Sequence, residues 1–312
     1  MSITVRSLFK SYGDLVAVDS IDLDVNAGTV FGFLGPNGAG KSTTIKLLTT
    51  LIPPTSGKID ILGIDAIKNP LDVRKRIGVV LQQPSYEPNL SVEKSLEKYG
   101  MMWNVDKKTR KERTNELIDV FDLQEIRKKK NEDLSIGQRR RVQVAREFMH
   151  EMDLLFLDEP TVGLDPAARR KLLDYLKNKA RSGLTIFYTT HVLTEAEYLC
   201  DEIAVINKGK VLAVDTPGQL KSTFGQEKTI KIHLSDRHDS LPQLLSGISG
   251  CTVDFSTGTD IIIQSSKAEL VLSHVLSILI GNNIPIEDLS ALPTTLEEIF
   301  LKMVRDTNAP NN

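Results

Sequence analysis

The sequence predicts an α/β protein with a mostly parallel central sheet, followed by a smaller α+β unit. Four short apolar runs have the length and composition of buried strands, and helical patterns separate them. These runs are Val30–Leu34, Ile77–Leu81, Leu154–Leu157 and Leu184–Tyr188. Strands that alternate with helices favour a parallel sheet covered on both faces. The 312 residues, 40% hydrophobic and 26% charged, are enough for one large domain or two domains with ordinary cores.

Two further regions complete the expected first domain, which spans residues 1–223. Residues 3–13 and 15–25 alternate apolar with polar side chains, as half-exposed antiparallel strands do, and they predict a β-rich flap. Residues 91–130 are strongly charged with helical patterns, and they predict an inserted helical lobe at about residues 91–150. The first domain is therefore expected to combine a parallel sheet, an antiparallel flap and a helical lobe.

A second domain is expected over residues 224–312. Its patterns follow the order strand, helix, strand, strand, helix, strand, which resembles a small ferredoxin-like unit. Strands are expected at 228–234, 251–255, 261–264 and 284–289, with helices near Leu241 and from Lys267. A last helix is expected over Thr294–Val304.

The stretch "FGFLGPNGAGKSTTIKLL", Phe31–Leu48, leads from an apolar strand through three glycines into a helix. It contains Gly-x-x-x-x-Gly-Lys-[Ser/Thr], a loop that cradles phosphates with backbone N–H groups and a helix N-terminus. Lys41 is expected to bring positive charge to the β- and γ-phosphates, and the Ser42 hydroxyl to ligate Mg²⁺. The expected nucleotide-binding residues are Gly35, Pro36, Asn37, Gly38, Ala39, Gly40, Lys41, Ser42 and Thr43. The loop alone leaves the function open, because kinases, GTPases, motors and transporters share it.

Two other strand ends carry side chains that suit phosphate chemistry. The strand in "LLFLDEP" ends in Asp158 and Glu159, at the sheet edge where open α/β sheets bind their ligands. Asp158 is suited to the Mg²⁺ shell, and Glu159 to polarising an attacking water molecule. His191 follows the strand "LTIFYTT", where it either contacts the γ-phosphate or has only a structural role.

The segment "LSIGQRRRVQVAREF", Leu134–Phe148, resembles the signature sequence of the ATP-binding cassette (ABC) ATPases, usually Leu-Ser-Gly-Gly-Gln. The phosphate loop, this segment, the strand ending at Glu159, the "VGLD" turn at Val162–Asp165 and His191 stand in family order. The match covers residues 1 to about 223. Ile136 replaces the first glycine of the signature. Either this position does not need a positive φ, which is our expectation, or the signature is weakened.

The resemblance implies hydrolysis of ATP with Mg²⁺ and assigns further site residues. Tyr12 matches the aromatic residue that stacks on adenine, or it is an ordinary strand residue. Gln82 matches the glutamine that senses magnesium and water, although Gln83 is adjacent. The implied catalytic residues are Gln82, Glu159 and His191, and the implied Mg²⁺ ligands are Ser42, Gln82 and Asp158.

The resemblance also implies a dimer, made either by two copies of this chain or with a sister cassette. In the family two cassettes pair head to tail, so that the signature of one subunit reaches the γ-phosphate held by the other. The residues expected to reach across are Ser135, Gly137, Gln138 and Asp165. Arg139–Arg141 are expected to be a solvated helix face or to contact a partner.

Several features bear on location and partners. The most apolar run, Leu270–Ile280, is too short to cross a bilayer, so transport would need a separate transmembrane permease subunit. The net charge of −2 gives no reason to expect nucleic acid. Cys200 and Cys251 lie far apart in the sequence, which favours a reduced cytosolic compartment. The expected location is therefore the cytoplasmic face of a membrane, peripherally bound. The residues that could line a groove for the permease, or else belong to the core, are Tyr86, Leu90, Met101, Met102 and Trp103.

The tail "ALPTTLEEIFLKM", Ala291–Met303, is similar to the segment that closes the cassettes of drug, antibiotic and lipid exporters. It contains Pro293, Leu296, Glu297 and Phe300 of that pattern, with one residue of extra spacing. The expected function is therefore the ATP-hydrolysing subunit of a multisubunit exporter. Two alternatives are a soluble cassette ATPase that acts on a ribosome, nucleic acid or iron–sulfur assembly, and a regulatory module that hydrolyses ATP poorly. The transported compound is not evident from the sequence.

Overall fold

The computed structural model describes residues 1–83, 85–224, 228–238, 240–245, 248, 251–255, 259–265, 267–292 and 295–306. The chain forms two compact units, Met1–Thr216 and Pro217–Asn312. The division lies before the boundary expected at 223/224, because helix α8 (Pro217–Phe224) packs against helix α11 (Leu296–Asp306) of the second unit. The Pro293 position of the exporter-like tail lies outside the described residues.

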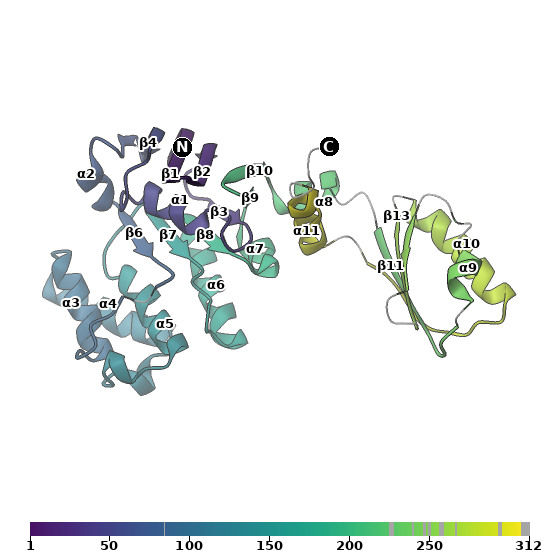
Figure 1. Cartoon of the computed structure of the whole chain (residues 1–312). Coiled ribbons are helices and arrows are strands. Elements are labelled where there is room, and N and C mark those ends of the chain that lie inside the picture. The colour runs from purple at the N-terminus through teal and green to yellow at the C-terminus, as the bar shows by residue number, and fades with distance from the viewer. Residues whose placement is uncertain are drawn as a thin grey trace. The chain divides into compact units, whose positions relative to one another are not determined.

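A six-stranded sheet forms the centre of the first unit (Figure 1). Its order is β10 (Lys210–Asp215), β9 (Glu202–Asn207), β3 (Val30–Leu34), β8 (Thr185–Thr190), β7 (Leu154–Asp158) and β6 (Ile77–Val80). The strands from β9 to β6 pair in parallel, and β10 joins β9 antiparallel. Every residue of β3, β7 and β8 is buried, which explains their apolar sequences. The four strands predicted from apolar runs are confirmed.

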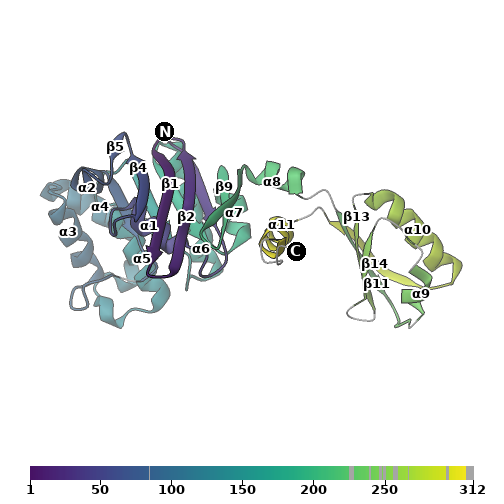
Figure 2. The same cartoon turned by 45° about the horizontal axis from the view of Figure 1, so that its top comes forward.

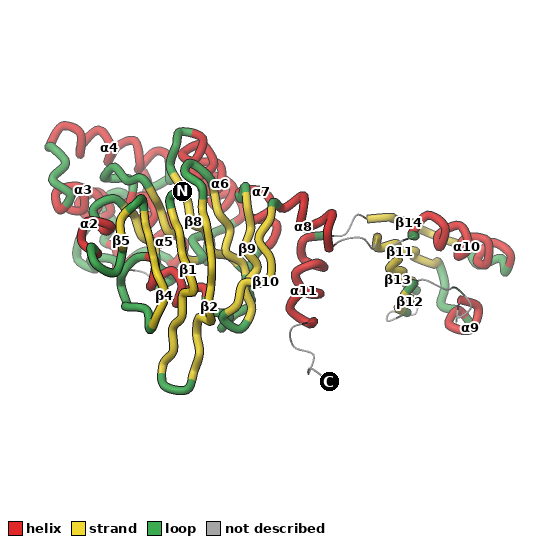
Figure 3. The backbone as a smooth tube through the Cα atoms, turned by 90° about the horizontal axis from the view of Figure 1, so that it is seen from above, coloured by secondary structure: helices red, strands yellow, loops and turns green. Residues whose placement is uncertain are grey.

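An antiparallel sheet of four strands packs beside it. Its order is β2 (Leu15–Val25), β1 (Ile3–Tyr12), β4 (Ser56–Ile61) and β5 (Ile64–Asp65). Figure 3 shows β1 and β2 as long neighbouring strands joined by a turn, paired from Ile3 with Val25 to Tyr12 with Leu15. Alternate residues of these strands enter one core with Phe31 and Phe33 of β3. The expected β flap is therefore confirmed.

The helices of the first unit fall into two groups. The first group packs on the sheets: α1 (Lys41–Leu48) and α2 (Pro70–Arg74) contact both sheets, whereas α6 (Pro166–Arg181) and α7 (Leu193–Leu199) contact strands of the six-stranded sheet. The helical lobe consists of α3 (Val92–Met102), α4 (Lys107–Val120) and α5 (Ile136–Glu147), with short 3₁₀ turns at Gln124–Ile126 and Asn131–Asp133. Figures 1 and 2 show these three helices gathered together, and α3 packs on both α4 and α5. Helix α5 also contacts β6, so the lobe is attached to the sheet near the site.

The second unit has its own antiparallel sheet and core. The strand order is β12 (Thr252–Asp254), β13 (Asp260–Ser265), β11 (Lys228–Leu234) and β14 (Ile286–Leu292). Helices α9 (Leu241–Leu245) and α10 (Ala268–Gly281) contribute to the core with Ile230 and Ile232 of β11. With β13 inserted between β11 and β12, this is the split βαβ arrangement of a ferredoxin-like unit. The small α+β unit expected after the α/β domain is therefore present.

Candidate active site

The phosphate loop joins β3 to α1 at the carboxyl edge of the parallel sheet. Gly40 has φ 106°, and a Cβ there would lie 2.4 Å from the Ala17 carbonyl oxygen. A Cβ on Gly35 would lie 2.5 Å from the Ile206 carbonyl oxygen. Glycine at these two positions is therefore required by backbone conformation and by close packing. The predicted residues Pro36, Asn37, Gly38, Ala39, Ser42 and Thr43 all lie on this loop or on the first turn of α1.

Lys41 is the first residue of α1, and its side chain is only 6% exposed. Its Nζ donates hydrogen bonds to the carbonyl oxygens of Gly35 at 2.8 Å and Pro36 at 3.2 Å. Burial lowers the pKa of the Lys41 ammonium, while the charges of Glu159 and Asp158 act in the opposite direction. The loop thus holds one buried cation beside its row of backbone N–H groups.

Asp158 ends β7 and Glu159 follows it, and a single threonine of β8 forms hydrogen bonds to both residues. The Thr189 hydroxyl donates to Oδ1 of Asp158 at 2.7 Å and accepts from the backbone N–H of Glu159 at 3.2 Å. Glu159 has φ 49°, which is unusual for a residue with a side chain and turns the chain sharply after the strand. Both residues are buried, with whole-residue exposures of 2% and 7%. Sequence reasoning did not identify Thr189, because a threonine inside an apolar strand carries no motif.

Three of the predicted residues meet at the Glu159 carboxylate. Lys41 Nζ lies 3.8 Å from Oε1, and Nδ1 of His191 lies 3.3 Å from the same oxygen. Gln82 Nε2 donates to Oε2 at 3.4 Å. The geometry favours Gln82 over Gln83, whose backbone oxygen instead accepts from Gln143. Residues from four separate segments therefore form one cluster at the edge of the sheet.

The signature segment begins helix α5 with a reciprocal cap. The Ser135 hydroxyl accepts from the Gln138 N–H at 3.2 Å, and the Gln138 side chain accepts from the Ser135 N–H at 3.0 Å. Ile136 is absent from the residues with positive φ, as expected, and its side chain is 65% exposed. A Cβ on Gly137 would lie 2.4 Å from the Gly163 carbonyl oxygen, so the signature packs directly on the "VGLD" turn.

Asp165 and Tyr12 lie at the margins of this arrangement. Asp165 caps helix α6 by accepting from the Ala168 N–H at 2.9 Å, and that hydrogen bond lowers the pKa of its carboxyl group. Tyr12 ends β1 with a side chain that is 49% exposed, and Lys10 Nζ lies 5.1 Å from the centre of its ring. In the described part of this single chain, Ser135, Asp165 and Tyr12 have no hydrogen bond to the Lys41–Glu159 cluster.

The arginines of α5 hold the Gln82 segment in place. Arg140 is 4% exposed and donates to the carbonyl oxygens of Leu81 at 2.8 Å and Gln82 at 2.9 Å. Arg146, which sequence reasoning missed, donates to Ser85. Arg139 and Arg141 donate to the Tyr86 hydroxyl and the Phe121 carbonyl oxygen. The interpretation of Arg139–Arg141 as a solvated face is therefore wrong for the buried Arg140, whereas Arg139 and Arg141 are half-buried and hydrogen-bonded to adjoining segments.

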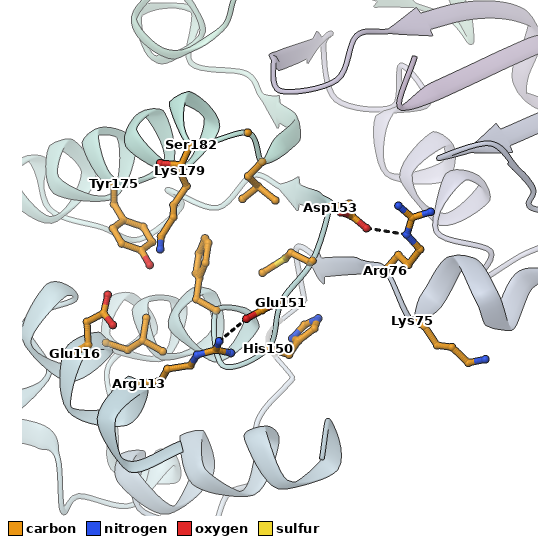
Figure 4. A pocket seen from close by; sticks show the side chains of 15 residues that line it. Lys75, Arg76, Arg113, Glu116, His150, Glu151, Asp153, Tyr175, Lys179 and Ser182 are labelled. Atoms are coloured by element: carbon orange, nitrogen blue, oxygen red, sulfur yellow. Dashed lines mark hydrogen bonds and ion pairs between the residues drawn. The ribbon is translucent and has the colours of Figure 1, made fainter. Parts of the chain in front are cut away.

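A cavity of about 650 Å³ lies at the opposite, amino-terminal edge of the parallel sheet. Its lining includes Arg76 and Asp153, which precede β6 and β7. Figure 4 shows two ion pairs there, Arg76–Asp153 and Arg113–Glu151. The charged atoms lie 2.7 Å apart in the first pair and 2.9 Å apart in the second. This cavity is distinct from the cluster at Glu159, and its charges are largely paired.

A glycine-rich loop at a helix N-terminus, a buried lysine and strand-end carboxylates together define a phosphate-loop nucleoside triphosphatase. The ABC transporter family model matches residues 18–162. The daunorubicin resistance ATP-binding protein DrrA3 of Streptomyces coeruleorubidus is 35% identical over 98% of this chain and 96% of its own length. The linearmycin resistance ATP-binding protein LnrL of Bacillus subtilis is 32% identical over 97% of this chain and 98% of its own length. The Nod factor export ATP-binding protein I of Cupriavidus metallidurans is 40% identical over 69% of this chain and 71% of its own length.

Solved structures show the same cassette. An ATP-binding subunit of an ABC transporter superposes with a TM-score of 0.67 and 28% identity, over 72% of this chain and 94% of that chain. The dimeric cassette MJ0796, in a post-hydrolysis state bound to ADP and Pi, superposes with a TM-score of 0.64 and 25% identity. The superposition covers 69% of this chain and 98% of that chain. This chain therefore belongs to the ABC transporter family, as an ATP-binding subunit with ATPase activity. Of the helices that the structure describes, none combines the length and the apolar character needed to cross a lipid bilayer.

Proposed function

We propose that this chain hydrolyses ATP to power export of a drug-like, antibiotic or lipid compound through a separate membrane permease. The observation that carries the export branch is the extent of similarity, because resistance proteins match both units over 98% and 97% of the chain. A third relative is named for Nod factor export, which agrees with transport out of the cell. The proposed location is the cytoplasmic face of the membrane, peripherally bound to the permease.

The proposed chemistry centres on Glu159. Its carboxylate is proposed to polarise the attacking water molecule, because this one acidic group contacts Lys41, His191 and Gln82. Lys41 and the backbone N–H groups of the loop neutralise and orient the phosphates. His191 lies 3.3 Å from Glu159 with a side chain that is 52% exposed, and it is proposed to contact the γ-phosphate. Tyr12 is proposed to stack on adenine.

The residues at this edge fit a Mg²⁺ ion that accompanies ATP. Asp158 presents a buried carboxylate oriented by Thr189, and Ser42 and Gln82 add hard oxygen ligands. No described group of three or more His, Cys, Asp or Glu side chains could hold a metal ion by itself. A single carboxylate with hydroxyl, water and phosphate oxygens is the donor set that Mg²⁺ prefers. When bound, Mg²⁺ would neutralise charge that develops on the phosphate oxygens.

A second cassette completes the proposed site. Ser135 and Gly137 begin helix α5, so their hydroxyl and N–H groups form an anion site at a helix N-terminus. We propose that Ser135, Gly137 and Gln138 bind the γ-phosphate held by the partner cassette, with Asp165 in the same interface. The dimeric structures of related cassettes support a dimer. The dimer would consist either of two copies of this chain or of this chain and a second, related cassette.

The end of α3 is the proposed contact with the permease. Met101 and Met102 are 58% and 66% exposed, and flexible methionine side chains adapt well to apolar partners. Trp103 instead is half-buried and stacks on the buried His150 with ring centres 3.9 Å apart, so its ring already has a partner within the chain. Tyr86 and Leu90, half-buried on the segment that follows Gln82, are placed in the same proposed contact.

Co-purification from native membranes tests this function. The tagged chain, solubilised in mild detergent, is expected to carry a stoichiometric multi-spanning membrane protein, identified by mass spectrometry. A Met101→Glu/Met102→Glu variant is expected to lose that partner. Leu71→Glu is the matched control, because Leu71 is an equally exposed apolar residue on α2 at 66%. Recovery only with ribosomes or nucleic acid would instead support the soluble cassette ATPases.

A further inference from the structure

Glu195 is a buried carboxylate close to the site whose role the mechanism above does not use. It lies on the short helix α7, which begins two residues after His191, and it is 3% exposed. An ionised carboxylate at this depth requires several hydrogen bonds or a countercharge. The structure supplies both.

Three hydroxyl groups donate to one oxygen of this carboxylate. Tyr188, Thr161 and Thr190 contact Oε2 at 2.7, 2.9 and 3.2 Å. Tyr188 and Thr190 belong to β8, and Thr190 directly precedes His191. Thr161 lies two residues after Glu159, on the turn that follows β7.

The other oxygen faces a cation from a different helix. Arg169 Nε lies 3.2 Å from Oε1 of Glu195. Arg169 belongs to α6, the helix that Asp165 caps. One carboxylate therefore links β8, the turn after Glu159, and the helix that follows the "VGLD" turn.

The network also fixes the backbone around His191. The Thr190 hydroxyl, which donates to Glu195, accepts from the Val192 N–H at 2.9 Å. The N–H of Glu195 donates to the Val192 carbonyl oxygen at 3.1 Å. Residues on both sides of His191 are thus bonded to the same network, while the His191 side chain itself is half exposed.

We propose that Glu195 is a positioning residue that holds the His191 imidazole against Glu159. This inference rests on the proposed function, in which both residues face the γ-phosphate and the attacking water. A displacement of about 1 Å in such a site lowers the rate by about 10²-fold. The 3.3 Å contact between Glu159 and His191 is the geometry that Glu195 maintains, through Thr190 on one side and Thr161 on the other.

The test substitutes Glu195→Gln in the full chain. The amide keeps the shape but carries no charge, so it loses the ion pair with Arg169 and can accept from the hydroxyl groups only through its single oxygen. We expect kcat for ATP to fall by about 10²-fold while the Kd for ATP stays unchanged. Glu197→Gln is the matched control, because it makes the same change on the exposed face of α7 and should leave kcat unaltered.

Two readouts separate positioning from a merely structural role. In a ¹³C-histidine NMR spectrum of the full chain, Glu195→Gln should shift or broaden the His191 signal and leave the His233 and His274 signals in place. Thr190→Val, which removes one hydroxyl, should change the same signal if Glu195→Gln does not fold. In a His191→Ala background, Glu195→Gln should lower kcat by a clearly smaller factor than in the wild-type chain.

An unmoved His191 signal in both variants, or equal losses of kcat in the two backgrounds, would overturn the positioning role. Failure of the proposed function is a different result. In that case His191→Ala and Glu159→Gln would themselves leave hydrolysis unchanged, whatever Glu195→Gln does.

Discussion

Nδ1 of His191 lies 3.3 Å from Oε1 of Glu159, the same oxygen that lies 3.8 Å from Nζ of Lys41. One side chain arrives from the exposed side of the site, and the other from the buried phosphate loop. The Glu159 side chain between them is only 9% exposed. Two residues distant in sequence therefore contact one oxygen atom of Glu159. Substitution of each of the three residues should have a different effect on ATP binding and on hydrolysis.

Glu159→Gln should preserve ATP binding and nearly abolish hydrolysis. The amide is isosteric with the carboxylate but cannot accept a proton, and loss of general base catalysis lowers rates by about 10²–10⁴-fold. Phosphate release in steady state and size-exclusion chromatography with ATP would show a slow enzyme trapped as a dimer. A variant with the wild-type rate would remove Glu159 from this role.

Lys41→Ala should lose affinity for ATP. Loss of a charge-assisted hydrogen bond costs about 1.5–3 kcal/mol, which corresponds to roughly 10- to 100-fold in Kd. Titration of a fluorescent ATP analogue measures the change. Lys46→Ala is the matched control, because Lys46 is an exposed lysine in the last turn of the same helix. Equal Kd values for the two variants would contradict the phosphate-loop assignment.

Gly40→Ala should destabilise the first unit more than Gly38→Ala. Both glycines have positive φ, 106° and 81°, so either alanine carries a conformational cost of about 1–2 kcal/mol. Only at Gly40 would the added Cβ also meet a backbone oxygen, Ala17 O at 2.4 Å, whereas the space at Gly38 is open. Urea denaturation of the two variants gives the comparison, and equal midpoints would contradict the packing argument.

His150→Phe should make the chain less sensitive to acid. Burial lowers the pKa of His150 to about 4, below the ordinary value of 6.5. The unfolded chain therefore binds more protons between these values, and stability falls as the pH falls from 6.5 to 4. At about 1.4 kcal/mol per pH unit this amounts to about 3 kcal/mol.

The phenylalanine keeps a ring stacked on Trp103 and removes the titration. Urea unfolding at pH 7 and pH 5 measures the difference between wild type and variant. The stability of the wild-type chain should fall more steeply over that interval than that of His150→Phe. Parallel curves would show that His150 is not the group responsible.

A fragment of residues 1–216 should fold and bind ATP. The first unit contains the phosphate loop, the signature and both carboxylates, and helix α8 packs with α11 of the second unit. A fragment of residues 1–223 should bind ATP equally well but expose the apolar side of α8, including Leu220, which is 1% exposed in the full chain. Circular dichroism and ANS fluorescence of the two fragments test this boundary.

Local motifs made much of the site predictable. Lys41 and Glu159 stand in short patterns of apolar strand followed by polar residues, so the sequence alone indicates both the element and the chemistry. Thr189 could not be found in this way, because its hydrogen bond to Asp158 joins residues 31 positions apart. Glu195 was missed for the same reason: four partners from three segments give it a role, and each lies elsewhere in the sequence.

The same distinction applies to the fold: features set by neighbouring residues were predictable, and features set by contacts between distant segments were not. The apolar run at Val30–Leu34 indicated a buried strand correctly, because all of its residues are buried. In the charge run Arg139–Arg141, the solvated interpretation is wrong for Arg140, since periodicity does not reveal that carbonyl groups of Leu81 and Gln82 face this side chain. Contacts between segments decide whether a charged side chain faces solvent or the protein.

The close approach of Gly137 and Gly163 has a consequence for communication between two reaction centres. The first turn of α5 and the turn after Glu159 approach each other backbone to backbone, since a Cβ on Gly137 would lie 2.4 Å from the Gly163 carbonyl oxygen, and the Ile136 side chain packs against Gly163 as well. In the proposed dimer, one of these turns serves the chain's own nucleotide and the other serves its neighbour's. Cleavage at one centre would then be transmitted mechanically to the other, so that the two ATP molecules are consumed in dependence on each other.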